Sequence, residues 1–493
     1  MSTPPSLIDQ VRGAITVASE RLAGTPAVPQ LTALSARLDE PLRVAIAGRV
    51  KAGKSTLLNA LVGQELAPTD AGECTRIVTW YRDGVTYRVT LYPMEGEPLN
   101  VPFSQNGGAI KVDLAGFRPE HVERLVVDWP STSLKAMTLI DTPGIASLSA
   151  ELSERAVAFL TGSDEEPTAS DAVLYLMHHL HSTDVRFLDA FRDQEVAHPA
   201  PINTVGVLSR ADEIGAGKLD AMATAARIAG RYRQDPKVRS LCQTVLPVAA
   251  LLAQSAETLE EEEYKALARI TAGEKADING LILSVDRFLK VEVGTIQLGP
   301  RTREHLLRRF GLFGVRLAVA LIAEGKAPTA DALARELVAR SGLIELRGVL
   351  LSQFAARRDV LKARAALMGL HRIVQAAEAP AELAAEVERI EAGAHEFAEI
   401  RLLNAHRSGA LTFRPEEAEQ VDRLLGAAGT SVTARLGLPK DANPADIRDA
   451  LAQALTRWRA RAENPLSSPE IVAAANVLVR TCEGMLAALS ATD

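Results

Sequence analysis

The sequence predicts an α/β nucleotide-binding domain, a mostly parallel sheet covered by helices, beside an α-helical bundle. The first observation is a glycine loop of the type that wraps phosphates, Gly48-Arg49-Val50-Lys51-Ala52-Gly53-Lys54-Ser55. It stands between an apolar strand-like run, 43–47, and a helical run, 55–61, which is the context that such a loop requires. The second is the alternation of strand and helix patterns from residue 42 to about 248. The third is helical spacing on both sides of that region.

The helical flanks define three parts of the chain. Leu7, Val11, Ile15, Ala18 and Leu22 recur at steps of three and four, which is typical of an amphipathic helix. We expect residues 1–38 to be helices that return to join the bundle, 39–345 to be the nucleotide domain, and 346–493 to be the helical neck and trunk.

Eight apolar runs are the strand candidates: 43–47, 77–82, 87–92, 125–128, 137–140, 172–177, 203–208 and 245–248. Asp83-Gly84 lies between the second and third runs and predicts a hairpin turn. After residue 249 we expect helices only. They are 341–374, which could reach roughly 45–50 Å if unbroken, then 381–405, 415–425, 444–461 and 469–489.

Composition limits the classes of partner. The 493-residue chain has a net charge of -7 and 4% aromatic residues, so no nucleic-acid partner is expected. Its three cysteines, in no metal-type spacing, favour a reducing compartment. Residues 1–10 have no signal-peptide core. We expect a cytoplasmic protein, with a peripheral place at the inner face of the cell membrane left open.

The glycine loop specifies phosphate chemistry. Backbone N–H groups from Gly48 to Ser55, together with Thr56 in the first helical turn, would face the phosphates at the positive end of a helix dipole. Lys54 would reach the β- and γ-phosphates, and the Ser55 hydroxyl would bind Mg²⁺.

A second motif, Asp141-Thr142-Pro143-Gly144, follows the strand candidate 137–140. At a strand end near the phosphate loop, Asp141 can hold Mg²⁺ through water. The Gly144 N–H can meet the γ-phosphate and detect its loss.

A third motif, Ser209-Arg210-Ala211-Asp212, follows the strand candidate 203–208. Asp212 can accept two hydrogen bonds from N1–H and the exocyclic amine of guanine, which adenine cannot donate. The Arg210 stem can lie along the base. This motif favours GTP and GDP over adenine nucleotides, and the sequence therefore predicts a P-loop GTPase. Ala249, after the last strand candidate, is a weaker candidate for contacting the base.

The catalytic group has several candidates. The polar segment 68–76 suits a switch over the γ-phosphate, and Thr75 is the first choice for a second hydroxyl on Mg²⁺, with Thr69 and Thr79 as alternatives. Ile145 stands where many GTPases orient water with Gln. Lys51 could supply a cation near the leaving group, or it could be a surface lysine that only balances charge.

Together these motifs resemble bacterial dynamin-like GTPases, and among them an isoniazid-inducible actinobacterial group. The resemblance rests on 48–61, on the segment from Pro68 to Thr75, on the motifs at 141–144 and 209–212, and on 309–316 and 340–343. Where most dynamins have Lys, this chain has Arg210. No strongly hydrophobic lipid-binding paddle is visible, and the loops at 404–413 and 426–441 are weak candidates for a membrane tip.

The resemblance implies a function as well as a fold. Dynamin-like proteins pair through their GTPase faces, which stimulates hydrolysis of GTP to GDP and phosphate, and they couple this cycle to membrane remodelling. The related group is linked to envelope stress and is thought to act with a sister dynamin-like protein. The alternatives are a soluble regulatory GTPase, or a GTP-controlled scaffold for the sister protein without its own membrane activity.

Overall fold

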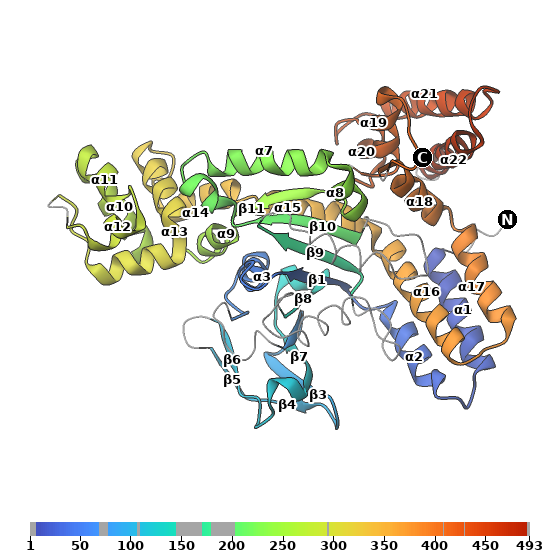
Figure 1. The fold of residues 1–493 in the computed structure, drawn as a ribbon, viewed down its shortest axis with the longest axis horizontal. Coiled ribbons are helices and arrows are strands. Elements are labelled where there is room, and N and C mark those ends of the chain that lie inside the picture. Colours follow the sequence, from blue (N-terminus) through green and yellow to red (C-terminus); the bar gives the residue numbers. More distant parts are fainter. Residues whose placement is uncertain are drawn as a thin grey trace.

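The computed structural model describes residues 6–68, 77–105, 109–143, 170–178, 203–292, 295–407, 409–427 and 429–490. Its strands are β1 Leu42–Gly48, β2 Val78–Arg82, β3 Arg88–Pro93, β4 Leu99–Asn100, β5 Phe103–Gln105, β6 Ile110–Val112, β7 Val122–Asp128, β8 Met137–Asp141, β9 Ala172–Met177, β10 Thr204–Ser209 and β11 Val245–Val248. Figure 1 shows them at the centre of an elongated molecule.

The helices up to the end of β11 are α1 Leu7–Arg21, α2 Ala27–Arg37, α3 Lys54–Val62, α4 Thr132–Lys135, α7 Ala221–Gln234 and α8 Pro236–Leu241, with the short helices η2 Pro119–His121 and η4 Ala211–Ala216. Those after it are α9 Ala250–Glu257, α10 Glu261–Thr271, α11 Lys275–Leu281, α12 Val285–Lys290, α13 Pro300–Ala323, α14 Ala330–Arg340, α15 Leu343–Val349, η5 Leu350–Phe354, η6 Ala355–Arg357, α16 Arg358–Ala376, α17 Ala381–Gly393, α18 His395–Arg407, α19 Pro415–Leu424, α20 Val432–Leu436, α21 Pro444–Ala462 and α22 Pro469–Ser490.

Nine strands form one sheet in the order β11-β10-β9-β1-β8-β2-β7-β3-β4. From β11 to β8 all neighbours are parallel, as the strand–helix alternation predicts. Side chains alternate between two cores: Val44 and Ile46 of β1 face one, and Ala45 and Ala47 face the other, under α7 and α8. The parallel strands are buried on both faces, which explains their continuous apolar sequences.

The predicted hairpin at Asp83-Gly84 is wrong. β7 lies between β2 and β3, parallel to β2 and antiparallel to β3. A Cβ at Gly84 would lie 2.7 Å from the Asp128 Cβ, so the turn passes close over the end of β7. The Asp128 carboxylate accepts hydrogen bonds from Arg82 and Arg88 on the two flanking segments, and this charge pairing at its carboxyl end favours the inserted position of β7.

Two predicted long helices are each divided. The stretch 341–374 contains α15 and α16, separated by the irregular turns η5 and η6. The stretch 381–405 contains α17 and α18. The apolar spacing continues across both breaks, so the pattern alone gave no sign of them. In the first break, Arg357 donates hydrogen bonds to the carbonyls of Leu425 and Gly426, which fixes the turn against the C-terminal helices.

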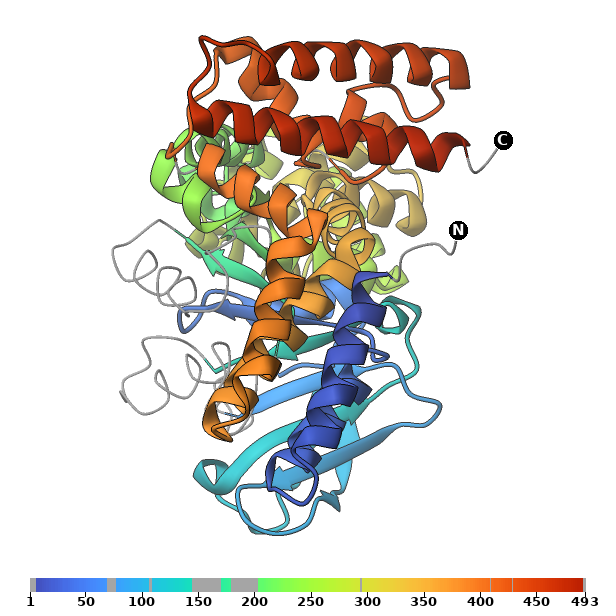
Figure 2. The same cartoon turned by 90° about the vertical axis from the view of Figure 1, so that its right-hand side faces the viewer.

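The N-terminal helices return to the helical part, as expected. α1 packs on α16 and α17, and α2 packs on α16 (Figure 2). A buried ion pair joins this bundle to the sheet: Arg37, at the end of α2, lies 2.8 Å from Asp171, just before β9. The second Asp171 oxygen accepts the backbone N–H of Arg43 on β1 at 2.8 Å. Lys362 of α16 donates to the carbonyls of Arg37, Leu38 and Glu40.

Two further helical units have cores of their own. Helices α10 to α14 form a unit at one end of the molecule, continuous with α9. Helices α18 to α22 form another, around Trp458. In this second unit, α22 is the one described helix that is long and apolar enough, by length and composition, to cross a membrane. One third of that helical window is buried in the fold, and core helices of soluble proteins pass the same test.

Gly342 is required where α15 begins. Its φ is +81°, and an added Cβ would lie 2.2 Å from the Pro247 carbonyl oxygen in β11. We expect Gly342→Ala to cost about 2 kcal/mol or more, since it combines backbone strain with an overlap. Thermal unfolding checks this against Gly409→Ala, where φ is +79° and no atom lies within 4 Å of the added Cβ. Equal losses in both variants would contradict the role of the close approach.

Candidate nucleotide site

The predicted motifs meet at one edge of the sheet. The parallel strands β1, β8, β10 and β11 end there with Gly48, Asp141, Ser209 and Val248. Ligand sites of open parallel sheets lie outside the carboxyl ends of the strands. Segments that are far apart in the sequence therefore form a single candidate site.

The phosphate loop depends on glycines at two positions. Gly48 has φ of +148°, and an added Cβ would lie 2.5 Å from the Leu176 carbonyl oxygen on β9. Gly53 has φ of +93° and begins α3. Lys51 also has positive φ, +62°, which costs energy for a residue with a side chain. The loop is thus held in a tight shape between β1 and α3, with Lys51 exposed at its tip.

Lys54 lies beneath this loop. Its side chain is 9% exposed, and Nζ donates to the carbonyls of Gly48 and Arg49, both at 3.4 Å. Burial lowers the pKa of the Lys54 ammonium, and the charge of Asp141 partly opposes that change. A positive charge that is weakly solvated and weakly bonded is well placed to attract an anion.

Ser55 and Asp141 are in direct contact. The Ser55 hydroxyl donates to Asp141 Oδ2 at 2.7 Å, while the buried Oδ1 has no hydrogen-bond partner among the described residues. Burial raises the pKa of the Asp141 carboxyl, and Lys54 and Ser55 oppose the rise. A hydroxyl and a carboxylate oxygen without a partner are oxygen ligands of the kind that Mg²⁺ prefers, so these residues fit the predicted metal.

Arg210 joins the base motif to the phosphate loop. Its Nη2 donates to the Lys51 carbonyl at 2.9 Å, and its Nη1 lies 3.1 Å from the Glu213 carboxylate. Arg210 itself has φ of +52°. The residue expected to lie along the base therefore also fixes the tip of the phosphate loop.

Asp212 is buried beside this link, with 6% of its surface exposed. Burial raises the pKa of its carboxyl to about 6; the charge of Glu213 also raises it, while its own backbone N–H, Arg210 and His178 lower it. Ser209 supports the motif from behind, since its hydroxyl donates to the Met177 carbonyl at 3.3 Å.

The remaining predicted site residues have different surroundings. Thr75, Thr69 and Gly144 lie outside the described residues. Thr79 is buried within β2, where its hydroxyl donates to the Ile77 carbonyl. Ala249 is fully buried; its N–H donates to the Ser341 carbonyl and its own carbonyl accepts from Ala253. Both backbone polar groups of Ala249 therefore have a partner within the fold.

The sequence patterns did not reveal one neighbour of Asp212, the helix α13. α13 is interrupted at Gly311, where φ is 61° and ψ is 176°, and an added Cβ there would lie 3.9 Å from Asp212 Oδ2. A glycine inside an apolar helical run was the available signal of a break. Nothing in the spacing connected that break with Asp212.

Comparison with known proteins identifies the class. The Dynamin family model matches residues 44–211. Isoniazid-induced protein IniC of Mycobacterium tuberculosis, from strains CDC 1551 / Oshkosh and ATCC 25618 / H37Rv, is 41% identical over 498 residues, which cover 99% of each chain. The chain therefore belongs to the dynamin family, and it is a bacterial dynamin-like GTPase that binds guanine nucleotides.

Two further similarities are more distant. A bacterial dynamin-like protein of Nostoc punctiforme is 31% identical over 130 residues, 24% of this chain and 19% of its own. A solved structure of an oligomerised bacterial dynamin pair aligns over 99% of this chain and 77% of its own, at 12% identity and a TM-score of 0.34.

The raised pKa of Asp212 has a consequence for stability. Between pH 4 and 6 the folded protein holds this proton more tightly than the unfolded chain, so the ionised carboxylate costs stability above pH 6, by about 3 kcal/mol at most. We expect Asp212→Asn to stabilise the nucleotide-free protein at pH 7.5 and to do so less at pH 5. Thermal unfolding at both pH values measures this, with the exposed Asp286→Asn on α12 as control. A gain that is the same at both pH values would contradict the assignment.

Proposed function

We propose that this GTPase holds GTP or GDP with Mg²⁺ at the carboxyl edge of the sheet and couples hydrolysis to self-association and membrane remodelling. The observation that carries the proposal is the group of Lys54, Ser55 and Asp141, of which Lys54 and Asp141 are buried. A cation and a hydroxyl from the start of α3 meet a carboxylate oxygen without a partner among the described residues, at the end of β8. An anionic ligand and its metal would satisfy all three.

Each residue has a distinct part in the proposed mechanism. Loop amides from Gly48 to Thr56 bind the phosphates, and Lys54 neutralises charge on the β- and γ-phosphates. Ser55 and Asp141, the latter through water, would hold Mg²⁺, which stabilises the charge that develops on the phosphate oxygens. Asp212 selects guanine, and Arg210 orients both the base and the loop.

Two further residues, Thr75 and Gly144, are assigned roles from their sequence motifs. Thr75 would add a second hydroxyl to Mg²⁺, and the Gly144 N–H would meet the γ-phosphate. Ile145 offers no hydrogen bond to the attacking water. The exposed Lys51, whose backbone carbonyl is fixed by Arg210, is the proposed source of extra positive charge.

Self-association through the GTPase face is supported by the exposure of that edge. Val50 is 48% exposed beside Lys51, and the Arg210 side chain is 44% exposed. A second GTPase domain, either of this chain or of a sister dynamin-like protein, could cover this edge and exclude water from the reaction. We place the protein in the cytoplasm, peripheral at the inner face of the membrane.

The alternative function is a GTP-controlled scaffold, or a soluble regulatory GTPase, without membrane activity of its own. One observation favours it. Arg435, in the candidate membrane tip at 426–441, forms a largely buried ion pair with Glu399 at 2.9 Å. Its charge is engaged inside the C-terminal unit and is not free for a lipid headgroup.

Liposome co-sedimentation of the full chain separates the two functions. Anionic vesicles are incubated with the protein alone, with GDP, and with a non-hydrolysable GTP analogue. Binding in the GTP-analogue state supports membrane remodelling. No binding in any state, together with assembly on GTP, supports the scaffold.

Pairing predicts that GTP turnover per molecule rises with protein concentration, because a partner completes the exposed catalytic edge. Phosphate release measured over a hundred-fold concentration range tests this. A constant turnover number would contradict activation by pairing and would point to an outside activator.

Lys51→Ala tests the proposed catalytic cation. We expect kcat to fall about ten-fold or more, as when one stabilising group is lost, while GDP affinity changes little because the amides of the loop remain. Lys265→Ala is the matched control, since Lys265 is exposed and pairs with Glu262 on α10. Full kcat in Lys51→Ala would leave Lys51 as a charge-balancing surface residue.

A further inference from the structure

We propose that α13 forms part of the guanine site, and that Gly311 and Arg309 are positioning residues that aim the Asp212 carboxylate at the base. The inference rests on the proposed function, because it assumes that Asp212 binds guanine. It adds one wall of the site, at Gly311, and a side chain that supports this wall, Arg309. Both residues belong to the helical unit α10 to α14, which lies outside the nucleotide motifs in the sequence.

Gly311 of α13 lies beside Asp212. Its backbone has φ of 61° and ψ of 176°, a combination that only glycine adopts without strain. A Cβ would lie 3.9 Å from Asp212 Oδ2 and 3.8 Å from the end of Leu251 on α9. The break therefore brings the α13 backbone beside the carboxylate, and a side chain at position 311 would be in van der Waals contact with it.

The loop after Asp212 closes against the same helix. A Cβ at Gly217 would lie 3.4 Å from the Asp212 carbonyl oxygen and 3.6 Å from the Phe313 Cβ of α13. Arg316, one turn further along α13, donates to the carbonyls of Ala216 and Gly217. Asp212 and the residues that follow it are thus bonded to or packed against α13.

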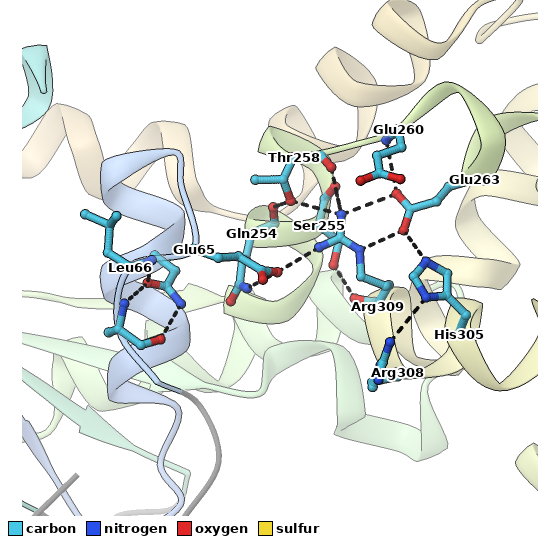
Figure 3. A network of polar contacts seen from close by, with 12 residues as sticks. Glu65, Leu66, Gln254, Ser255, Thr258, Glu260, Glu263, His305, Arg308 and Arg309 are labelled. Carbon is cyan, nitrogen blue, oxygen red and sulfur yellow. Dashed lines mark hydrogen bonds and ion pairs between the residues drawn. The ribbon is translucent and has the colours of Figure 1, made fainter. Parts of the chain in front are cut away.

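Arg309 fixes α13 just before the break (Figure 3). Its Nε donates to Glu263 at 2.7 Å, its Nη1 to Glu65 at 3.1 Å, and its Nη2 to the Thr258 carbonyl at 2.8 Å. The Ser255 hydroxyl donates to the backbone carbonyl of Arg309. One guanidinium is therefore bonded to α10, to the end of α9 and to the residues that follow α3.

Through Glu65, the hydrogen bonds of Arg309 connect α13 to the helix that begins at the phosphate loop. Glu65 follows α3, the helix that begins at the phosphate loop, and it also accepts from Gln254 of α9 at 2.9 Å. The next residues, Leu66 and Ala67, donate their backbone N–H groups to the Asn59 side chain of α3. Arg309 thus fixes the base wall relative to the phosphate-binding helix, which sets the distance between the two halves of the nucleotide site.

A purely structural role is the competing explanation, and Arg303 provides the comparison. Arg303 is on the same helix and is 5% exposed, and it donates to the carbonyls of Leu298, Phe288 and Val291. Its bonds stay within the helical unit. Replacing the Arg303 side chain should lower the stability of that unit without changing the position of Asp212.

The test compares GDP with inosine diphosphate, which lacks the exocyclic amine. Asp212 would accept a hydrogen bond from this amine in GDP. Dissociation constants of the nucleotide-free full chain are measured by competition against a fluorescent GDP. We expect the wild type to prefer GDP by about ten-fold or more, the magnitude of one hydrogen bond to a charged group. In Arg309→Gln and Gly311→Ala the preference should fall to near one. Arg309→Lys should give an intermediate value.

The controls are Arg303→Gln and Gly325→Ala, the latter at φ of +70° with no atom within 4 Å of the added Cβ. Both should keep the wild-type preference, whatever they do to the thermal midpoint. A full preference for GDP in Arg309→Gln, Arg309→Lys and Gly311→Ala, with only the midpoint lowered, would overturn the inference. A wild type without any preference for guanine would instead overturn the proposed function itself.

Discussion

The parallel pairing of β1 with β8 on one side and β9 on the other is the constraint on which the site depends. It places Gly48 and Asp141 at one edge, so that α3 can begin at Lys54 with Ser55 within hydrogen-bond distance of Asp141. The pairing is maintained by burial on both faces and by Asp171, whose carboxylate accepts hydrogen bonds from the Arg43 N–H of β1 and from Arg37 at the end of α2. A shift of register would separate the hydroxyl from the carboxylate.

The phosphate half of this site was predictable because its chemistry is local. A glycine loop, a strand before it and a helix after it are read from neighbouring residues, and Asp141 follows a strand whose pairing with β1 is common to this fold. The prediction of a hairpin at Asp83-Gly84 was wrong because strand order depends on contacts that are not local. The insertion of β7 between β2 and β3 rests on pairing with residues that are distant in the sequence, and it leaves no mark on the turn itself.

Two helix breaks also depend on contacts with distant parts of the chain, and the sequence pattern does not show those contacts. Gly311 is visible as a glycine in a helical run, but its nearest polar neighbour, Asp212, belongs to another part of the chain. The break at Leu350–Phe354 has no such sign, since its apolar residues continue the helical spacing. It is stabilised from outside, by Gln353 donating to the Ala427 carbonyl and by the adjoining bonds of Arg357. Tertiary contacts override local preference at both places.

The positions of the helical parts restrict how a nucleotide could act on them. The nucleotide edge is formed by the carboxyl ends of the strands, whereas Asp171 and Gln243, which bond to Arg37 and Arg407 of the helical parts, precede β9 and β11 at the opposite edge. In the described part of the chain, a displacement at the phosphates therefore reaches α16 and the C-terminal unit through elements that span the sheet. α3 is one of these, because it begins at the phosphate loop and its last carbonyls accept from Arg347 of α15. Since α15 leads directly through the break into α16, the phosphate-binding helix is attached to the bundle by the hydrogen bonds of Arg347.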